Sequence, residues 1–122
     1  MAVKICIVED EHSIATMYEF KLQQSGYEVY IAGDGVTGLA LIEKVRPDLI
    51  LLDLMLPEMD GADLLQRLRA TDWGSGIRVI VLTNISKDEA PQKLRFLDVE
   101  RYIVKAHYTP KQVVDTIQEV LK

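Results

Sequence analysis

PDLILLDLMLPEMDG, residues Pro47–Gly61, contains a run of four large aliphatic residues that ends at an acid, Asp53. Prolines lie on both sides of the run, and such a short apolar run is typical of a strand buried on both faces. Strands of this kind belong to parallel sheets covered by helices, and open sheets of that class bind ligands beyond the carboxyl ends of their strands. The segment therefore predicts a buried strand at 49–53 whose last residue lies at a ligand-binding edge.

Strand-like and helical patterns alternate along the whole chain. Strands are expected at residues 3–8, 28–32, 49–53, 77–83 and 101–104. Helices are expected at residues 12–24, 34–45, 61–70, 87–97 and 109–121. Because parallel strands need long crossover connections, this alternation predicts an α/β fold: a doubly wound, five-stranded parallel sheet with five helices.

Two of the expected helices contain proline near their start. The helix at 109–121 has clear start signals, since Thr109 can cap it and Pro110 follows at its first position. The helix at 87–97 contains Pro91, which an α-helix tolerates only within its first turn. We therefore expect both helices, with Pro91 in the first turn of the earlier one.

Length and composition restrict the class of protein. The 122 residues fit one domain, and 48% hydrophobic residues are enough for a packed core. A net charge of −5 argues against direct nucleic-acid binding by this domain, because phosphate contacts need clustered Lys and Arg. No apolar run approaches the length of a membrane span, no signal peptide is evident, and Cys6 alone cannot form an internal disulfide. A cytoplasmic protein without membrane contact is the default expectation.

Polar residues follow four of the expected strands: Glu9 and Asp10, Asp53, Thr83 and Asn84, and Lys105. The carboxyl ends of parallel strands lie at one edge of the sheet, so these side chains are expected to lie together. Crowded carboxylates repel one another, and a divalent cation such as Mg²⁺ removes that conflict. A lysine ammonium and a threonine hydroxyl can hold an incoming phosphoryl group. The set predicts an aspartate nucleophile that receives a phosphoryl group with help from a metal and a lysine.

Four motifs carry a resemblance to a known family: VEDE at 8–11, DLILLDLMLPEMDG at 48–61, VLTN at 81–84 and YIVK at 102–105. In this order they closely resemble the receiver domain of bacterial two-component response regulators, as in chemotaxis regulators, and the resemblance covers essentially the whole chain. It implies one receiver domain over residues 1–122 and a flavodoxin-like sheet in the strand order 2-1-3-4-5. It also implies a signalling switch and not a conventional enzyme, apart from Mg²⁺-dependent self-phosphorylation and slow self-dephosphorylation.

The resemblance implies roles at the metal and phosphate site. Asp53 would accept a phosphoryl group from a sensor histidine kinase or a phosphotransfer protein and become an aspartyl phosphate. Asp10 and Asp53 would bind Mg²⁺ directly, together with the backbone carbonyl of Met55. Glu9 would act on the metal through water.

Three further residues would transmit the signal. Lys105 would contact the phosphoryl group, Thr83 would move toward it, and Tyr102 would swing inward behind Thr83. This movement would alter the face formed by the fourth helix, the fifth strand and the fifth helix. That face would bind a downstream protein or a fused output domain, and a phosphorylation-dependent dimer is an alternative.

Two residues beside the predicted site depart from the commonest pattern of the family. Ala106 replaces the usual proline after the lysine. Because a cis bond before a non-proline residue costs about 2.5–4 kcal/mol, the Lys105–Ala106 bond is expected to be trans. Asn84 replaces a smaller residue and is expected to narrow access for phosphodonors and phosphatases.

Two further departures concern the lifetime of the phosphate. Met55 and Ile85 lie two residues beyond Asp53 and Thr83, at positions that tune hydrolysis in the family. Both side chains are bulky and apolar, so neither can position an attacking water. A long-lived aspartyl phosphate is therefore predicted.

Three other functions compete with a phosphorylated switch. A phosphatase of the haloacid-dehalogenase type needs a second acid two residues after its nucleophile, where this chain has Met55. A flavodoxin-like nucleotide-binding module would want a phosphate loop after the first strand, where Glu9, Asp10 and Glu11 repel phosphate. A constitutive interaction module of the same fold would not need the key residues, which are all present. The sequence leaves two outputs open, a stand-alone regulator and the receiver part of a longer one.

Overall fold

The computed structural model describes residues 2–122. Its five strands are β1 (Lys4–Val8), β2 (Glu28–Ala32), β3 (Leu49–Leu52), β4 (Arg78–Thr83) and β5 (Val99–Val104). They form one parallel sheet in the order β2-β1-β3-β4-β5. The predicted α/β class, the parallel sheet and the strand order are therefore confirmed.

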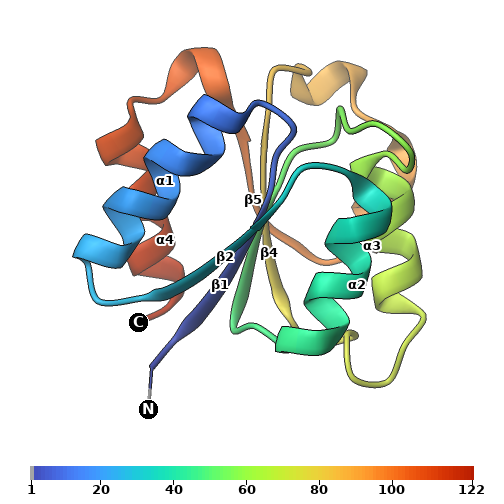
Figure 1. The fold of residues 1–122 in the computed structure, drawn as a ribbon. Coiled ribbons are helices and arrows are strands. Elements are labelled where there is room, and N and C mark those ends of the chain that lie inside the picture. The colour runs from blue at the N-terminus through green and yellow to red at the C-terminus, as the bar shows by residue number, and fades with distance from the viewer. Residues whose placement is uncertain (1) are drawn as a thin grey trace.

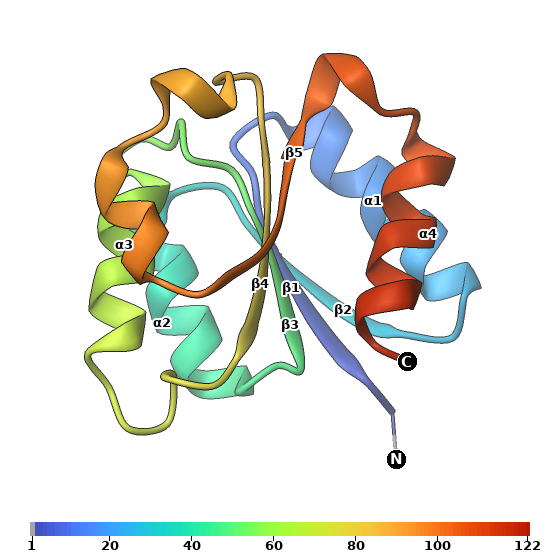
Figure 2. The same ribbon diagram turned by 180° about the vertical axis from the view of Figure 1, so that it is seen from behind.

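Helices cover both faces of this sheet. The α-helices are α1 (His12–Gln24), α2 (Gly35–Val45), α3 (Gly61–Arg69) and α4 (Pro110–Val120). Figures 1 and 2 show α1 and α4 together on one face and α2 and α3 together on the other. None of the helices within residues 2–122 combines the length and the apolar character needed to cross a membrane.

The central strand β3 is buried along its whole length, as predicted. Leu49 and Leu51 pack into the core on the α1 and α4 side, whereas Ile50 and Leu52 pack into the core on the α2 and α3 side. Successive side chains of a strand point to opposite faces, so a strand between two cores has no polar face. This is why the sequence of β3 is apolar without interruption.

Side-chain caps fix the starts of three helices. Asp34 caps α2, Asp60 caps α3 and Thr109 caps α4. In each case the side-chain oxygen accepts a hydrogen bond from the backbone N–H three residues later, at 2.7, 2.8 and 3.1 Å respectively. Such caps satisfy an N–H that has no partner within the helix. The caps expected at Asp34 and Thr109 are confirmed.

The chain between β4 and β5 differs from the expectation. The prediction of an α-helix at 87–97 is wrong. Residues 86–97, called the 86–97 segment below, contain two 3₁₀ helices instead, η1 (Lys87–Glu89) and η2 (Gln92–Phe96). Pro91 lies between them. In an α-helix Pro91 could not donate a hydrogen bond to the carbonyl four residues earlier, and its ring would clash with that carbonyl. The described part of the chain therefore has four α-helices and not the predicted five.

A short 3₁₀ helix, η3 (Lys105–His107), follows β5 directly. No peptide bond between residues 2 and 122 is cis. The predicted trans Lys105–Ala106 bond is therefore confirmed. Strand β5, which precedes η3, begins at Val99, two residues earlier than the predicted start at residue 101.

Candidate functional site

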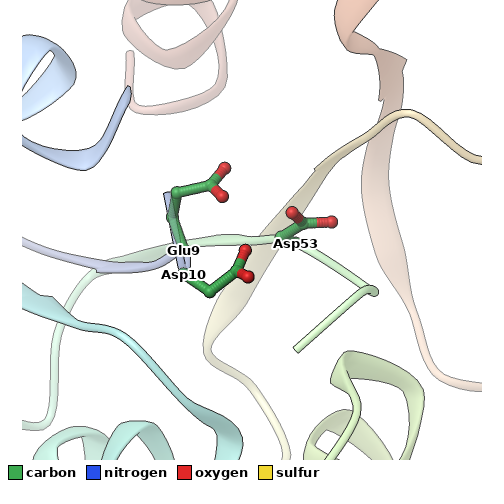
Figure 3. A group of neighbouring side chains, drawn as sticks. All are labelled: Glu9, Asp10 and Asp53. Carbon is green, nitrogen blue, oxygen red and sulfur yellow. The ribbon is translucent and has the colours of Figure 1, made fainter. Parts of the chain in front are cut away.

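Three carboxylates meet at the carboxyl edge of the sheet (Figure 3). Glu9 and Asp10 follow β1, and Asp53 follows the neighbouring strand β3. One carboxylate oxygen of each residue lies within 4.8 Å of those of the other two. Glu9 and Asp53 are buried, at 4% and 5% exposed, whereas Asp10 faces solvent. The structure therefore brings together the three acids that were predicted to share this edge.

The ammonium group of Lys105 lies between two of these acids. Its Nζ is 2.6 Å from Oε1 of Glu9 and 3.1 Å from Oδ2 of Asp53. Burial by itself would lower the pKa of Lys105, but the hydrogen bond to Glu9 and the charge of Asp53 outweigh burial, so the pKa is raised. Lys105 therefore stays charged at neutral pH and offsets part of the negative charge.

For Glu9, the effect of burial on the pKa is stronger than the effect of its hydrogen bonds. Desolvation raises the pKa of its carboxyl above the ordinary value, although the hydrogen bonds from Lys105 and from the backbone N–H of Glu11 act in the opposite direction. That N–H lies 3.1 Å from Oε2 of Glu9. The nearby charge of Asp53 raises the pKa of Glu9 further. Burial, together with the charge of Asp53, therefore outweighs the two hydrogen bonds and disfavours the ionised form of Glu9.

This donor set fits a hard divalent cation. When ionised, three carboxylates and one ammonium group leave a net charge of −2, which a divalent cation neutralises. Mg²⁺ prefers oxygen ligands and keeps several waters, so it needs only one or two carboxylates from the protein. The solvent-facing side of Asp10 provides an open approach to the cluster. Burial of the other two acids supplies the weakly screened charge that attracts a cation.

The chain turns sharply after Asp53. The N–H of Met55 donates to Oδ1 of Asp53 at 3.1 Å, and the N–H of Gly61 donates to the carbonyl of Leu54 at 2.9 Å. Oδ1 of Asp53 is thus held by Met55 while Oδ2 is held by Lys105. The side chain of Met55 is 58% exposed and lies at the rim of the site. These bonds fix the orientation of the Asp53 carboxylate before any ligand binds.

Thr83 and Tyr102 are joined to each other through Ile85. Thr83 is fully buried at the end of β4, and its Oγ1 accepts a long hydrogen bond, 3.4 Å, from the N–H of Ile85. The hydroxyl of Tyr102 donates to the carbonyl of Ile85 at 2.7 Å. Burial raises the pKa of Tyr102, and the charge of Asp53 adds to this, so the phenol remains a donor at neutral pH. Among the described residues, no hydrogen bond joins Thr83 or Tyr102 to the acids.

A cleft of about 640 Å³ opens beside Asp53. Its polar lining includes Asp10, Lys105 and Asn84, and its apolar lining includes Met55, Ile85 and Pro91. Asn84 therefore lies where it was expected to narrow access to the site. Pro91 belongs to the 86–97 segment, so this segment forms part of the wall of the cleft.

Two contacts of the site were not predicted. Glu9 was expected to act on a metal and Lys105 on phosphate, yet the structure pairs them directly. Glu9 follows β1 and Lys105 follows β5, and these strands are separated by β3 and β4, so the two side chains meet across two intervening strands. The second contact is that of the Ile85 backbone with Thr83 and Tyr102. The sequence indicated a role for Ile85 only in the lifetime of the phosphate, because backbone hydrogen bonds have no signature in the sequence.

A family model named response regulator receiver domain matches residues 5–118. The match covers most of the chain, so the chain belongs to the response regulator receiver domain family. Receiver domains are signalling modules of two-component systems and not conventional enzymes. The cluster of Glu9, Asp10 and Asp53 is typical of the magnesium site of such domains and is consistent with a phosphoacceptor site.

Curated relatives and solved structures agree with this assignment. The chain is 35% identical to the alkaline phosphatase synthesis transcriptional regulatory protein PhoP of Bacillus subtilis, over all of this chain and 50% of that protein. It is also 35% identical to the DNA-binding response regulator MtrA of Mycobacterium tuberculosis, over all of this chain and 52% of that protein. The chain thus spans about half the length of the curated relatives it matches.

The solved structures resemble the chain over nearly its whole length. The chemotaxis response regulator CheY4 of Vibrio cholerae superposes with a TM-score of 0.89 at 30% identity, covering 98% of this chain and 99% of that one. A CheY-like receiver domain protein from Methanospirillum hungatei superposes with a TM-score of 0.88 at 31% identity, covering 99% of this chain and 94% of that one. The fold around the acidic cluster is therefore that of known receivers.

Proposed function

We propose that this domain is a phosphorylation-activated switch in which Asp53 accepts a phosphoryl group from a sensor histidine kinase or a phosphotransfer protein. The observation that carries the proposal is the buried Asp53 carboxylate, held by Lys105 beside the acid pair Glu9 and Asp10. Phosphoryl transfer needs mainly positioning and neutralisation of charge, and these residues supply both. Membership of the receiver family supports the same assignment.

In the proposed reaction a carboxylate oxygen of Asp53 attacks the phosphorus of the donor phosphohistidine. A P–O bond forms while the P–N bond breaks, and the bonding electron pair stays on the imidazole nitrogen of the donor. Lys105 exchanges its present bond to Asp53 for one to a phosphoryl oxygen. Mg²⁺, held by Asp10, Asp53 and the carbonyl of Met55, with Glu9 acting through water, would offset negative charge on the carboxylates and the phosphoryl oxygens.

The signal then passes through Ile85. Phosphorylation adds roughly −1.5 to −2 charge beside the buried Thr83 hydroxyl. We expect that hydroxyl to turn toward the phosphoryl group, which removes it as an acceptor for the Ile85 N–H. Because Tyr102 is bonded to the carbonyl of the same residue, a shift of Ile85 moves the Tyr102 ring. Thr83 and Tyr102 therefore act as one switch.

The proposed output surface consists of the 86–97 segment, β5 and α4. A cavity of about 740 Å³ lies between the segment and β5, and Tyr102 is part of its lining. A downstream protein or a fused output domain that binds this surface would sense the position of Tyr102. The names of the PhoP and MtrA relatives favour a fused DNA-binding output, and a stand-alone regulator or a phosphorylation-dependent dimer would use the same surface. A cytoplasmic location suits these partners.

The lining of the cleft supports a long-lived phosphate. Met55 and Ile85 both border the cleft beside Asp53, and neither carries a group that could orient an attacking water. We expect wild-type protein to lose its phosphate more slowly than a Met55→Asn, Ile85→Glu double variant. Faster loss from wild type would contradict this expectation.

Phosphorylation by a small donor tests the proposal. Purified protein is incubated with Mg²⁺ and acetyl phosphate, and intact mass is measured for wild type, for Asp53→Asn and for wild type with excess chelator. One phosphoryl adduct is expected on wild type with Mg²⁺, and none in the other two samples. An adduct on both proteins, or on neither, would defeat the proposed role of Asp53.

A further inference from the structure

Gly35, the first residue of α2, lies against the loop that follows Asp53. A Cβ atom on Gly35 would lie 1.8 Å from the carbonyl oxygen of Met59, and real Cβ atoms essentially never come within 3.0 Å of such an atom. The N–H of Gly35 also donates to the carbonyl of Pro57 at 3.2 Å. The start of α2 and the loop are therefore in direct backbone contact, which only a residue without a side chain permits.

The loop in question, residues 54–60, carries the carbonyl of Met55 that is proposed to bind Mg²⁺. Its two ends are held close together, because the N–H of Gly61 donates to the carbonyl of Leu54. Within the part of the chain that the structure describes, the Gly35–Pro57 bond is the one backbone hydrogen bond that ties residues 55–59 to another element. Figure 1 shows α2 and α3 side by side, with this loop leading into α3. The middle of the loop, at Pro57 and Met59, thus contacts the start of α2.

We propose that Gly35 is a positioning residue for the metal site, since it lets α2 support the loop that presents Met55. This inference rests on the proposed function, in which Asp53 and Met55 hold Mg²⁺. A side chain at Gly35 would push against a backbone carbonyl, which cannot rotate away as a flexible side chain can. The displaced Met59 would carry the loop with it, because no other backbone hydrogen bond between described residues anchors residues 55–59 to a neighbouring element.

Gly35→Ala tests the proposal against two matched glycine controls. Gly33→Ala changes the same connection between β2 and α2, but a Cβ there would meet no atom within 4 Å. Gly74→Ala introduces strain far from the loop, since its Cβ would lie 2.5 Å from Cδ1 and 2.6 Å from the carbonyl oxygen of Leu68. The first control adds a methyl group without a clash, and the second destabilises the fold without touching the loop.

Three quantities are measured for each protein. The dissociation constant of Mg²⁺ is measured by calorimetry without a phosphodonor, and the free energy of unfolding by urea titration. Amide hydrogen exchange of residues 55–59 is measured in metal-free protein. We expect Gly35→Ala to raise the Mg²⁺ dissociation constant roughly tenfold, the lower end of what loss of a supporting contact costs a metal site, and to speed exchange in the loop. Gly33→Ala should match wild type, and Gly74→Ala should lose stability with an unchanged dissociation constant.

Two outcomes would overturn the proposal. The first is a Gly35→Ala protein that binds Mg²⁺ as tightly as wild type, and the second is a weakening in Gly74→Ala that tracks its loss of stability. If Gly35→Ala does not fold, Asp34→Ala loosens the start of α2 without adding atoms, and an unchanged dissociation constant there would also refute it. Wild-type protein that takes neither Mg²⁺ nor phosphate would defeat the proposed function instead, while the exchange data in metal-free protein still report on the support of the loop.

Discussion

α4 and the 86–97 segment each follow a strand that ends beside the candidate site, yet only α4 is an α-helix. α4 begins with a capping box at Thr109, has Pro110 at its first position, and buries Val113, Val114 and Ile117. The 86–97 segment has no side-chain cap at the start of either 3₁₀ helix, and Leu94 is its one buried residue. The two regions lie on opposite faces of the sheet, and they differ in their helix caps and in how many residues they bury.

This difference shows how strongly the position of a proline controls a helix. At the first position Pro110 loses nothing, because that N–H has no partner within a helix, and its fixed φ angle suits the start. Pro91 lies four residues after Lys87 and interrupts the hydrogen bond that a helix starting there would need. The residues after it form only a short 3₁₀ helix, Gln92–Phe96, since a short uncapped segment cannot offset the cost of helix nucleation.

The 86–97 segment lacks helix caps, and contacts with side chains from α3 hold it in place. Nζ of Lys93 donates to Oδ1 of Asp63 at 2.5 Å. The guanidinium group of Arg69 donates to the carbonyls of Leu97 and Asp98 at 2.8 and 2.9 Å. These contacts are few and partly exposed, so this region is expected to be less stable locally than α4.

The largest effect on the free energy of unfolding should follow from truncating a core side chain of α4. Ile117→Ala removes a side chain with no exposed surface and is expected to lower the free energy of unfolding by about 2–5 kcal/mol. Leu94→Ala, the matched change in the 86–97 segment, should cost less because the loosely held segment can collapse into the space. Urea unfolding measures both, and equal losses would contradict the difference in local packing.

Removal of the helix cap should have the next largest effect. Thr109→Ala deletes the oxygen that accepts the N–H of Gln112 and is expected to cost about 1 kcal/mol in the free energy of unfolding. Ser86→Ala is the control, since Ser86 precedes η1 and its hydroxyl donates to the exposed Glu89 carboxylate instead of accepting a backbone N–H. Thermal or urea unfolding compares the two variants. A loss from Ser86→Ala as large as that from Thr109→Ala would contradict the assignment of caps.

Replacing each proline by alanine should change structure more than stability. Pro91→Ala restores the missing donor, so residues 87–97 are expected to gain α-helical character that backbone chemical shifts can detect. Pro110→Ala should leave the shifts of α4 unchanged, because that N–H needs no helical partner. Unaltered shifts in the 86–97 segment of Pro91→Ala would show that contacts with α3, and not the proline, prevent the helix.

The smallest effect should come from the ion pair between Lys93 and Asp63. The hydrogen bond and charge of Lys93 hold the pKa of Asp63 below its ordinary value of 3.8. The pair therefore stabilises the segment above pH 3.8, and this contribution is lost as pH falls through the lowered pKa of the folded state. Lys93→Met should return the Asp63 pKa toward 3.8 and speed amide exchange in the 86–97 segment at neutral pH but not in strong acid. Lys111→Met, which breaks an exposed pair within α4, is the control and should leave the segment unchanged.

Local signals were sufficient for most of the fold. The apolar run before Asp53 predicted the buried strand β3, and the caps at Asp34 and Thr109 predicted where α2 and α4 begin. These features depend on interactions within a few residues, so the sequence contains them directly. The exception was residues 87–97, where a helix was expected with Pro91 in its first turn, but the missing donor of Pro91 prevented it.

The candidate site was predictable as a set of residues but not as a set of contacts. Parallel strands bring their carboxyl ends to one edge, which predicts that Glu9, Asp10 and Asp53 lie together, as they do. Which of them Lys105 would bind could not be predicted, because that depends on how far a side chain just after β5 reaches across two intervening strands.

The sequence by itself determined the class of fold, the family and the three acids that gather at the candidate site, because periodicity, caps and strand-end motifs are local patterns. Only the tertiary structure decided how those residues connect: Lys105 between Glu9 and Asp53, Ile85 between Thr83 and Tyr102, and Gly35 beneath the loop that follows Asp53. Apart from the bond between Ile85 and Thr83, which spans only two residues, each of these contacts joins different strands, helices or loops. Their distances depend on the packing of the whole sheet, which no short stretch of sequence specifies.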